Sequence, residues 1–429
     1  MPTELRHATD DPGGTGGTAV DVGTAVNVVR VRGTLPALDS MRAVASIAVL
    51  GTHAAFWGGA YGHRGYGNAL ARLDVGVAIF FVLSGFLLSR AWFARHAHHT
   101  RAPRARAYLW HRLLRIFPVY LISAVAALVL LPGNDDASLT TWVHTLTLTN
   151  IYLDPELPAG LTQMWSLATE VAFYVTLPVL MWLVLSRRTH GGHGRSRLGV
   201  VLVAMLVVNI GWLALAPTAL AGTSAMVSVW LPGYLTWFGV GLLVAGAAAH
   251  LEAGGDAAES ARISVLLREV GRSPGACWVA ALALFAIAAT PLAGPSSLVA
   301  PAAAESVVKN LLYAAIAGLL ILPGVFADPD GRYVRVLSLP ALRHLGHISY
   351  GIFCIHLVVL ELVFRWRDME LFAGRTVELF TLALIGSVLV SEVLYRLVER
   401  PVLRWKNLFD RPASSTRATT TPSPASTGS

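Results

Sequence analysis

The chain has 429 residues, of which 55% are hydrophobic and only 14% charged, and its mean hydropathy is +0.59. A soluble domain of this size carries about a quarter of its residues as charged groups. The composition therefore excludes a large soluble globular protein. It indicates a polytopic membrane protein whose first partner is the lipid bilayer.

The net charge is +8 and the pI about 9.8, values that would also suit a nucleic-acid partner. The arginines, however, cluster in short connections between apolar segments, which is typical of membrane orientation rather than of a groove that follows phosphates. We therefore expect no nucleic-acid partner. The two cysteines, Cys277 and Cys354, lie in apolar segments without metal-ligand spacing, so we expect no metal site and no permanently bound cofactor.

Ten apolar segments predict an all-α, polytopic membrane fold, because each is long enough to cross about 30 Å at a rise of 1.5 Å per residue. The composition of residues 1–34 and 409–429 predicts disordered tails around one membrane domain at 35–408, without a signal peptide. The ten segments lie near 39–58, 73–94, 107–131, 163–186, 198–216, 226–249, 275–293, 303–326, 340–364 and 374–402.

The arginine bias of the connections predicts an orientation. The connections 95–115 and 187–197 are rich in arginine, and only 365–375 goes against the alternation. Three alternate connections contain neither Lys nor Arg: 132–162, 217–225 and 294–304. Because cytoplasmic loops carry the excess of basic residues, both termini are expected in the cytoplasm of a multi-pass plasma-membrane protein.

Polar residues inside these segments are the first candidates for a functional site, since they are costly in hydrocarbon. The stretch "MRAVASIAVLGTHAAF" places His53 about 16 Å deeper than Arg42 along one helix. Glu170, about 10 Å from the outer end of its own segment, is expected at the level of His53, with His356 nearby. A carboxylate beside an imidazole would fix its tautomer and stabilise the imidazolium that forms during proton transfer.

Plainer readings of these residues stay open. A single histidine in a membrane helix can serve only to hydrogen-bond a neighbouring helix, and Arg42 can simply place its charge at the headgroups. Arg112 and Arg115 share one helical face; they either orient the chain or form a fork for phosphate. With Arg42 they would hold a phosphorylated acyl donor such as coenzyme A, whose pantetheine arm would span the distance to His53.

The motifs together resemble the acyltransferase 3 family, integral-membrane O-acyltransferases that modify sugars, polysaccharides and some secondary metabolites. The resemblance covers roughly residues 35–405. Six stretches carry it in the family's order: "LDSMRAVASIAVLGTHA" (38–54), "DVGVAIFFVLSGFLLSR" (74–90), "RLLRIFPVYL" (112–121), "WSLATEVAFYVTLP" (165–178), "LGHISYGIFCIH" (345–356) and "LVERP" (397–401).

This resemblance implies an acyl-CoA co-substrate and a hydroxyl-bearing carbohydrate or metabolite as acceptor. It implies that His53 is the catalytic residue and Arg42 its Arg-x10-His partner. Arg112 and Arg115 match the family's RxxR motif, and Glu170 matches the glutamate of its W-S-L-x-x-E motif. Small residues that are usually glycine in the family are Ser40 and Ala43 here, and Phe353 stands where a second tyrosine is frequent.

The reaction expected is acyl transfer, with His53 held by Glu170 and deprotonating the acceptor hydroxyl, or with a covalent acyl-histidine step. No residue obviously stabilises the oxyanion, although the hydroxyls of Ser166, Tyr174 and Tyr350 are candidates. The candidate substrate-binding residues are His356, Tyr350, Tyr174, Ser166 and Asp74.

Two alternatives remain at this stage. A proton-coupled transporter would use Glu170, His53 and His356 as a relay, but it predicts inverted repeats, and the sequence shows no such internal symmetry. The other alternative stays within the acyltransferases and makes a macrolide-type natural product the acceptor.

Overall fold

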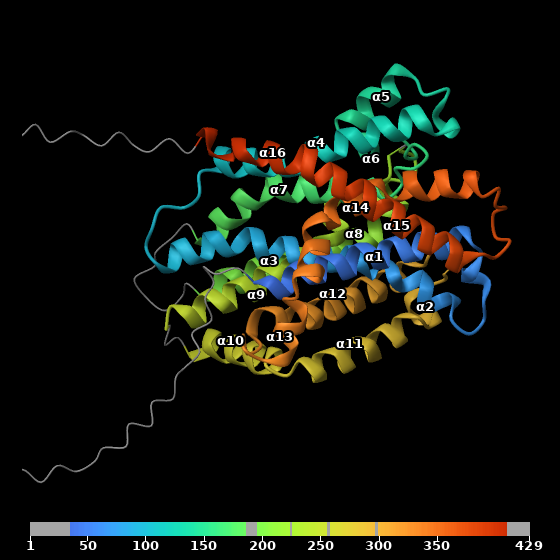
Figure 1. Cartoon of the computed structure of the whole chain (residues 1–429). Helices are drawn as coiled ribbons and strands as arrows, with labels where there is room; N and C mark the ends of the chain where they lie inside the picture. The colour runs from blue at the N-terminus through green and yellow to red at the C-terminus, as the bar shows by residue number, and fades with distance from the viewer. Residues whose placement is uncertain (1–34, 186–194, 224, 255–257, 297–298, 410–429) are drawn as a thin grey trace, which may run out of the picture.

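The computed structural model describes residues 35–185, 195–223, 225–254, 258–296 and 299–409. Apart from residue 409, both expected tails lie outside them. The described chain is all-helical and contains no strand, as expected, and its long helices run lengthwise through one bundle (Figure 1).

Helix α1 (Pro36–Trp57) lies at the centre of this bundle. It contacts α3 (Val75–Ala97), α12 (Ala303–Phe326), α14 (Pro340–Trp366) and α15 (Thr376–Leu394). A helix enclosed by other helices faces protein rather than lipid, so it can carry the polar side chains that a lipid-facing helix cannot.

Helices α4 (Ala105–Leu130), α7 (Met164–Leu185) and α8 (Arg195–Ala219) lie on the outside. Helix α9 (Leu235–Glu252) is more enclosed and packs against α3, α8 and α12. Shorter elements complete the chain: η1 (Ala60–Gly62), α2 (Gly67–Ala71), η2 (Arg72–Asp74), η3 (Pro132–Asn134), α5 (Leu139–Leu146), α6 (Asn150–Leu153), η4 (Val227–Val229), η5 (Leu231–Tyr234), η6 (Pro291–Ala293), α13 (Arg332–Leu337), the π-turn η7 (Tyr395–Glu399), α16 (Arg400–Val402) and η8 (Leu403–Phe409).

Small residues set the closest helix contacts. A methyl group at Gly85 of α3 would overlap the backbone of Phe238 on α9, and one at Gly241 of α9 would overlap the backbone of α3. On the other side of α1, a methyl group at Gly346 of α14 would overlap the backbone of Asp39. Close backbone approach of this kind is the usual way in which membrane helices gain packing energy.

Eight of the described helices are long and apolar enough to cross a membrane, and a ninth span results if one bent pair is counted. The pair is α10 (Ala258–Gly271) with α11 (Pro274–Ala288), which meet at 91°. It takes the place of the segment expected at 275–293. The first expected segment, 39–58, is α1, which is absent from the eight because its sequence is more polar, although its 22 residues span about 33 Å.

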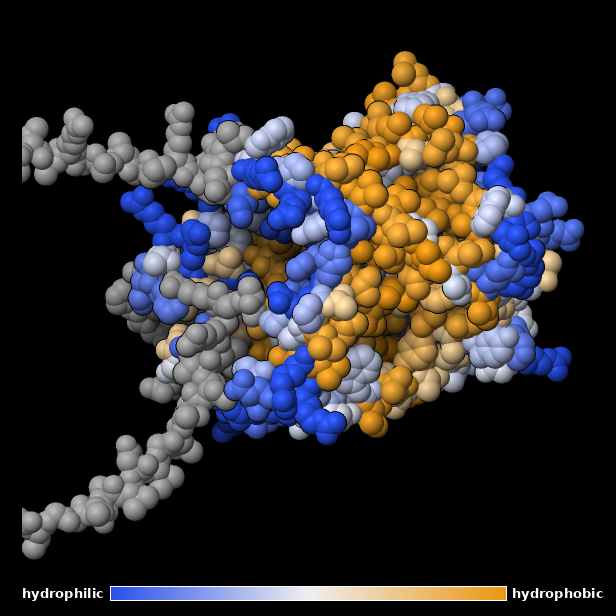
Figure 2. All heavy atoms as spheres, in the orientation of Figure 1, coloured by the Kyte–Doolittle hydropathy of each residue, from blue (hydrophilic) through white to orange (hydrophobic). Residues whose placement is uncertain are grey.

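The surface agrees with a bilayer around the bundle. Hydrophobic residues cover its middle and hydrophilic residues gather towards both ends (Figure 2). Large apolar side chains of α7, α8 and α15 point outward: Val175 and Val179 on α7, Val203 and Val207 on α8, and Leu389 on α15 are each 58% exposed or more. This apolar surface is what a multi-pass membrane protein presents to lipid.

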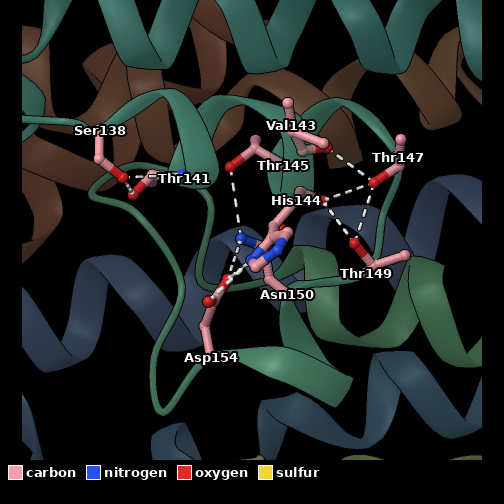
Figure 3. Close-up of polar contacts among 9 residues, drawn as sticks. All are labelled: Ser138, Thr141, Val143, His144, Thr145, Thr147, Thr149, Asn150 and Asp154. Carbon is pink, nitrogen blue, oxygen red and sulfur yellow. Dashed lines mark hydrogen bonds and ion pairs between the residues drawn. The ribbon is translucent and has the colours of Figure 1, made fainter.

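The connection between α4 and α7 is held by side-chain hydrogen bonds (Figure 3). The imidazole Nδ1 of His144 lies 2.9 Å from Oδ1 of Asp154, and Oδ2 of the same carboxylate accepts from the amide of Asn150 at 2.9 Å. The amide of Asn134 donates to the Ala159 carbonyl at 3.1 Å. These contacts fix both arms of the connection, so α7 begins at a defined depth.

That depth is well inside the bundle. The side chain of Gln163, directly before α7, donates from Nε2 to the Cys354 carbonyl at 3.1 Å, and Cys354 lies 14 residues into α14. Residues 155–163 therefore return into the protein before the helix starts. Every residue of α7 lies deeper than a helix beginning at the membrane surface would place it.

Candidate active site

A narrow cavity of about 80 Å³ lies between α1, α3, α4, α7 and α14. Its lining combines charged and hydroxyl side chains with aromatic and aliphatic ones. Its lining consists of Arg42, Phe80, Phe81, Leu83, Ser84, Arg115, Ile116, Ser166, Leu167, Glu170, Tyr174, Ser349, Tyr350 and Phe353. Six of these residues belong to the set proposed from the sequence: Arg42, Arg115, Ser166, Glu170, Tyr174 and Tyr350.

Two of the three expected arginines, Arg42 and Arg115, line this cavity, and Arg112 lies near them outside its lining. Arg42 is close enough to Arg115 and Arg112 for their like charges to interact. The guanidinium of Arg115 is also ion-paired with the carboxylate of Glu399, whose side chain is only 2% exposed. Glu399, which stands in the "LVERP" stretch, was not among the residues expected at the site. It places a fixed negative charge behind the arginines.

Glu170 belongs to this arginine end of the site. Its Oε1 accepts hydrogen bonds from the hydroxyl of Tyr174 at 2.7 Å and from the hydroxyl of Ser84, and Arg42 is a near electrostatic neighbour. No hydrogen bond or ion pair joins it to His53 in the described part of the chain. The expectation that Glu170 lies beside His53 is wrong because it assumed that α7 starts at the membrane surface.

His53 has a different neighbour. The centroids of its ring and of the His356 ring are 5.3 Å apart, with the ring planes tilted by 41°. The His356 side chain is fully buried, and its Nδ1 lies 2.8 Å from the Phe353 carbonyl. A carbonyl can only accept, so Nδ1 carries the proton and Nε2 of a neutral His356 is a free acceptor. Nε2 has no hydrogen-bond partner among the described residues.

Phe353 connects the two parts of the site. Its ring lines the cavity, and the centroid of that ring is 6.1 Å from the centroid of His356. The cavity therefore leads from the arginines to the edge of the histidine pair. Along α1 the two ends are separated by the eleven-position step from Arg42 to His53, about 16 Å.

The three hydroxyls considered for oxyanion stabilisation are already engaged. Tyr174 donates to Glu170, Tyr350 donates to the Ile116 carbonyl at 2.8 Å, and Ser166 donates to the Gln163 carbonyl at 3.0 Å. Each hydroxyl has one proton, so none has a second to offer a developing oxyanion in this conformation. They shape the cavity wall instead.

Asp74, the remaining candidate, does not line the cavity. Its carboxylate pairs with the ammonium of Lys309 on α12 at 2.6 Å and accepts from the hydroxyl of Tyr313. These contacts tie the start of α3 to α12.

The connection after α1 contacts the C-terminal part of α1, next to His53. The hydroxyls of Tyr61 and Thr52 lie 2.6 Å apart, and Thr52 precedes His53. Burial raises the pKa of Tyr61 to about 12, so the phenol stays neutral and can share its proton with Thr52. The contact holds this end of α1 in place beside its histidine.

Both cysteines, Cys277 and Cys354, are buried and unpaired, as small apolar side chains would be. The described residues contain no group of three or more His, Cys, Asp or Glu side chains that could hold a metal ion. The site offers the chemistry of arginines, carboxylates and imidazoles.

Comparisons with known proteins agree with this arrangement. The family model of the acyltransferase domain of the acyltransferase 3 family matches residues 35–396. The chain is 26% identical over 396 residues to acyltransferase MdmB of Streptomyces mycarofaciens, covering 86% of this chain and 92% of that protein.

A second relative is the peptidoglycan O-acetyltransferase OatA of Listeria monocytogenes serovar 1/2a, 26% identical over 165 residues. That match covers 35% of this chain and only 25% of OatA. No solved structure matches the chain.

The family match sets aside the transporter alternative, because it extends over every helix that builds the cavity and the histidine pair. This chain belongs to the acyltransferase 3 family and is a multi-pass membrane O-acyltransferase.

Proposed function

We propose that the enzyme transfers an acyl group from acyl-CoA to a hydroxyl of a sugar, a polysaccharide or a glycosylated metabolite. The observation that carries this proposal is the cavity itself. It begins at Arg42 and Arg115 and ends at Phe353, beside the His53–His356 pair. Phosphates at one end and a thioester at the other would match the two ends of acyl-CoA.

The arginines are the proposed donor site. Arg42, Arg112 and Arg115 supply guanidinium groups, which bind phosphate oxygens through paired hydrogen bonds. Glu399 occupies one face of Arg115, so we assign that arginine a smaller share of the phosphate binding than the other two. The acyl-CoA arrives and leaves as a co-substrate, and the reaction needs no permanently bound cofactor.

His53 is the proposed general base. It takes the proton of the acceptor hydroxyl, the alkoxide oxygen attacks the thioester carbonyl, the C–S bond breaks, and the proton passes from His53 to the leaving thiolate. His356, whose Nε2 is a free acceptor beside His53, would orient the hydroxyl or the His53 ring by accepting a hydrogen bond. Glu170 has no part in this step and would steady the arginine end.

A carbohydrate hydroxyl is the acceptor we favour, supported by the relative named as a peptidoglycan O-acetyltransferase. A macrolide-type metabolite is the alternative within the same chemistry. The arginine bias of the connections supports cytoplasmic termini in the plasma membrane, with the arginine end of the cavity on the cytoplasmic side.

Comparative mass spectrometry of a deletion strain and its complemented parent tests the acceptor. We expect an acyl group to be missing from the hydroxyls of an envelope glycan in the deletion strain, and to return with the wild-type gene but not with His53→Ala. Loss of the acyl group from a secreted metabolite, with unchanged glycans, would favour the macrolide-type alternative. Unchanged acylation in both fractions would contradict the proposal.

A further inference from the structure

Gln163 is a buried amide with one end unused. Its side chain is only 3% exposed, and it lies on the segment that returns into the bundle before α7. Nε2 donates to the Cys354 carbonyl at 3.1 Å, with the Phe353 carbonyl at 3.5 Å. An end that faces carbonyl oxygens must be the NH₂ group, so the other end is the carbonyl oxygen Oε1. Among the described residues Oε1 has no hydrogen-bond partner.

A buried amide oxygen without a partner is unfavourable, by about 1–3 kcal/mol in general, and therefore calls for an explanation. A structural role does not explain the unpartnered oxygen, since the NH₂ end alone makes the contact with α14. Asn209 shows the contrast: it donates to the Gly233 carbonyl at 2.7 Å and accepts from the Thr236 backbone N–H at 3.1 Å. Both ends of that amide are used by the protein.

The position of Gln163 suggests what uses the free end. The Phe353 carbonyl is shared by Gln163 Nε2 and His356 Nδ1, so both side chains meet at one backbone group. The backbone carbonyl of Gln163 also accepts a hydrogen bond from the hydroxyl of Ser166, which lines the cavity. Gln163 is outside the cavity lining but is hydrogen-bonded to two residues that belong to it, Ser166 and Phe353. An acyl-donor arm that extends beyond Phe353 towards His53 would therefore come close to Gln163.

We propose that Gln163 is a substrate-binding residue whose Oε1 accepts a hydrogen bond from an amide N–H of the pantetheine arm of acyl-CoA. This inference rests on the proposed function. The amide next to the thiol is two methylene groups from the sulfur, so holding its N–H would fix the thioester within a few bonds of the binding point. With Arg42 at the phosphate end, the arm would be held at both ends, and His53 would meet the carbonyl in one position.

The same free oxygen could instead accept from a hydroxyl of the acyl acceptor, or hold a water molecule. The location along the route from Arg42 favours the pantetheine amide. Binding measurements distinguish these three partners of Oε1. Only a contact with the pantetheine amide predicts that the loss of Oε1 changes the affinity for the acyl donor when no acceptor is present.

The test uses the full-length protein in detergent micelles and isothermal titration with two probes, acetyl-CoA and 3′,5′-ADP. The second probe is the nucleotide half of coenzyme A without the pantetheine arm. Gln163→Met keeps the length of the side chain and removes both amide ends. Gln163→Glu in its protonated form keeps a donor for Cys354 and a free carbonyl oxygen. Asn209→Leu is the matched control, a buried amide removed elsewhere, and the melting temperature of each variant checks folding.

We expect Gln163→Met to weaken acetyl-CoA binding by about five- to tenfold, the worth of one neutral hydrogen bond, with 3′,5′-ADP binding unchanged. Gln163→Glu should recover most of the loss, and Asn209→Leu should alter neither affinity. Unchanged acetyl-CoA binding in Gln163→Met would overturn the proposal in favour of an acceptor hydroxyl or a water. An equal loss for both probes would overturn it as well, by showing that the residue only supports the fold. If the wild-type protein bound neither probe, the acyl-CoA donor of the proposed function would fail, and this inference with it.

Discussion

The imidazole rings of His53 and His356 lie 5.3 Å apart where α1 contacts α14. His356 is held by the backbone carbonyl of Phe353, and no carboxylate is paired with either ring among the described residues. The proposed reactive end of this acyltransferase therefore contains two neighbouring histidines. The carboxylate expected there, Glu170, lies with the arginines.

Removing the arginines should weaken acyl-donor binding. Arg42→Ala and Arg112→Ala should each raise the KM for acetyl-CoA by about tenfold or more, the worth of a charge-assisted hydrogen bond, with a smaller effect on kcat. Initial rates of CoA release at varied acetyl-CoA concentration measure both constants. Arg335→Ala, an exposed arginine on α13 outside the cavity lining, is the matched control. An unchanged KM in both Arg42→Ala and Arg112→Ala would mean that these arginines serve only to orient the chain in the membrane.

Arg115 and Glu399 should behave as a coupled pair. Glu399 is 2% exposed and Arg115 28% exposed, so either single change leaves a poorly solvated charge. We expect Glu399→Gln and Arg115→Ala each to lower the melting temperature, and the double variant to lose less than their sum, with a coupling of about 1 kcal/mol or more. Thermal unfolding of the wild type, the two single variants and the double variant in one detergent gives this double-mutant cycle. Strictly additive losses would show that the contact does not contribute.

Glu170→Gln distinguishes the observed neighbours from those expected. The hydroxyls of Ser84 and Tyr174 both donate to Oε1, an arrangement that the carbonyl oxygen of glutamine can keep. Turnover should therefore fall by less than about tenfold. The loss of a carboxylate that orients a catalytic histidine costs about 10⁴-fold in a serine-protease triad. A loss of that size in kcat would mean that Glu170 reaches His53 during the reaction.

Reporter fusions test the orientation. A reporter fused after residue 406 should be active only in its cytoplasmic form, and one inserted at Gly65, in the connection after α1, only in its external form. Activity on the opposite sides would reverse the bundle and place the arginine end of the cavity outside the cell. The apolar surface alone fits either orientation.

Helices were the most predictable part of this protein, because apolar length and composition decide which segments enter a bilayer. The core of each expected segment is helical in the structure. The exceptions have local causes. The segment expected at 275–293 is α11, which forms a bent pair with α10 at 91°. Helix α1 is more polar than a lipid-facing span because other helices surround it.

The site was predictable where it follows a single helix. The distance from Arg42 to His53 is fixed by the helical rise, and the spacing of Arg112 and Arg115 by one turn. Relations between helices were harder. Glu170 was placed too near the surface because nothing local in the sequence shows that residues 155–163 return into the bundle. The pairing of Glu399 with Arg115 joins positions 284 residues apart, which no local pattern encodes.

The most direct test is the rate of acyl transfer by purified His53→Ala. It is measured as acyl-CoA-dependent acylation of the acceptor that the mass-spectrometric comparison of the deletion strain identifies. His344→Ala, an exposed histidine on α14 paired with Glu392, is the matched control, and the melting temperature confirms that both variants are folded. We expect His53→Ala to bind acetyl-CoA normally but to transfer no acyl group, and His344→Ala to work at nearly the wild-type rate. Near-normal transfer by folded His53→Ala would contradict it.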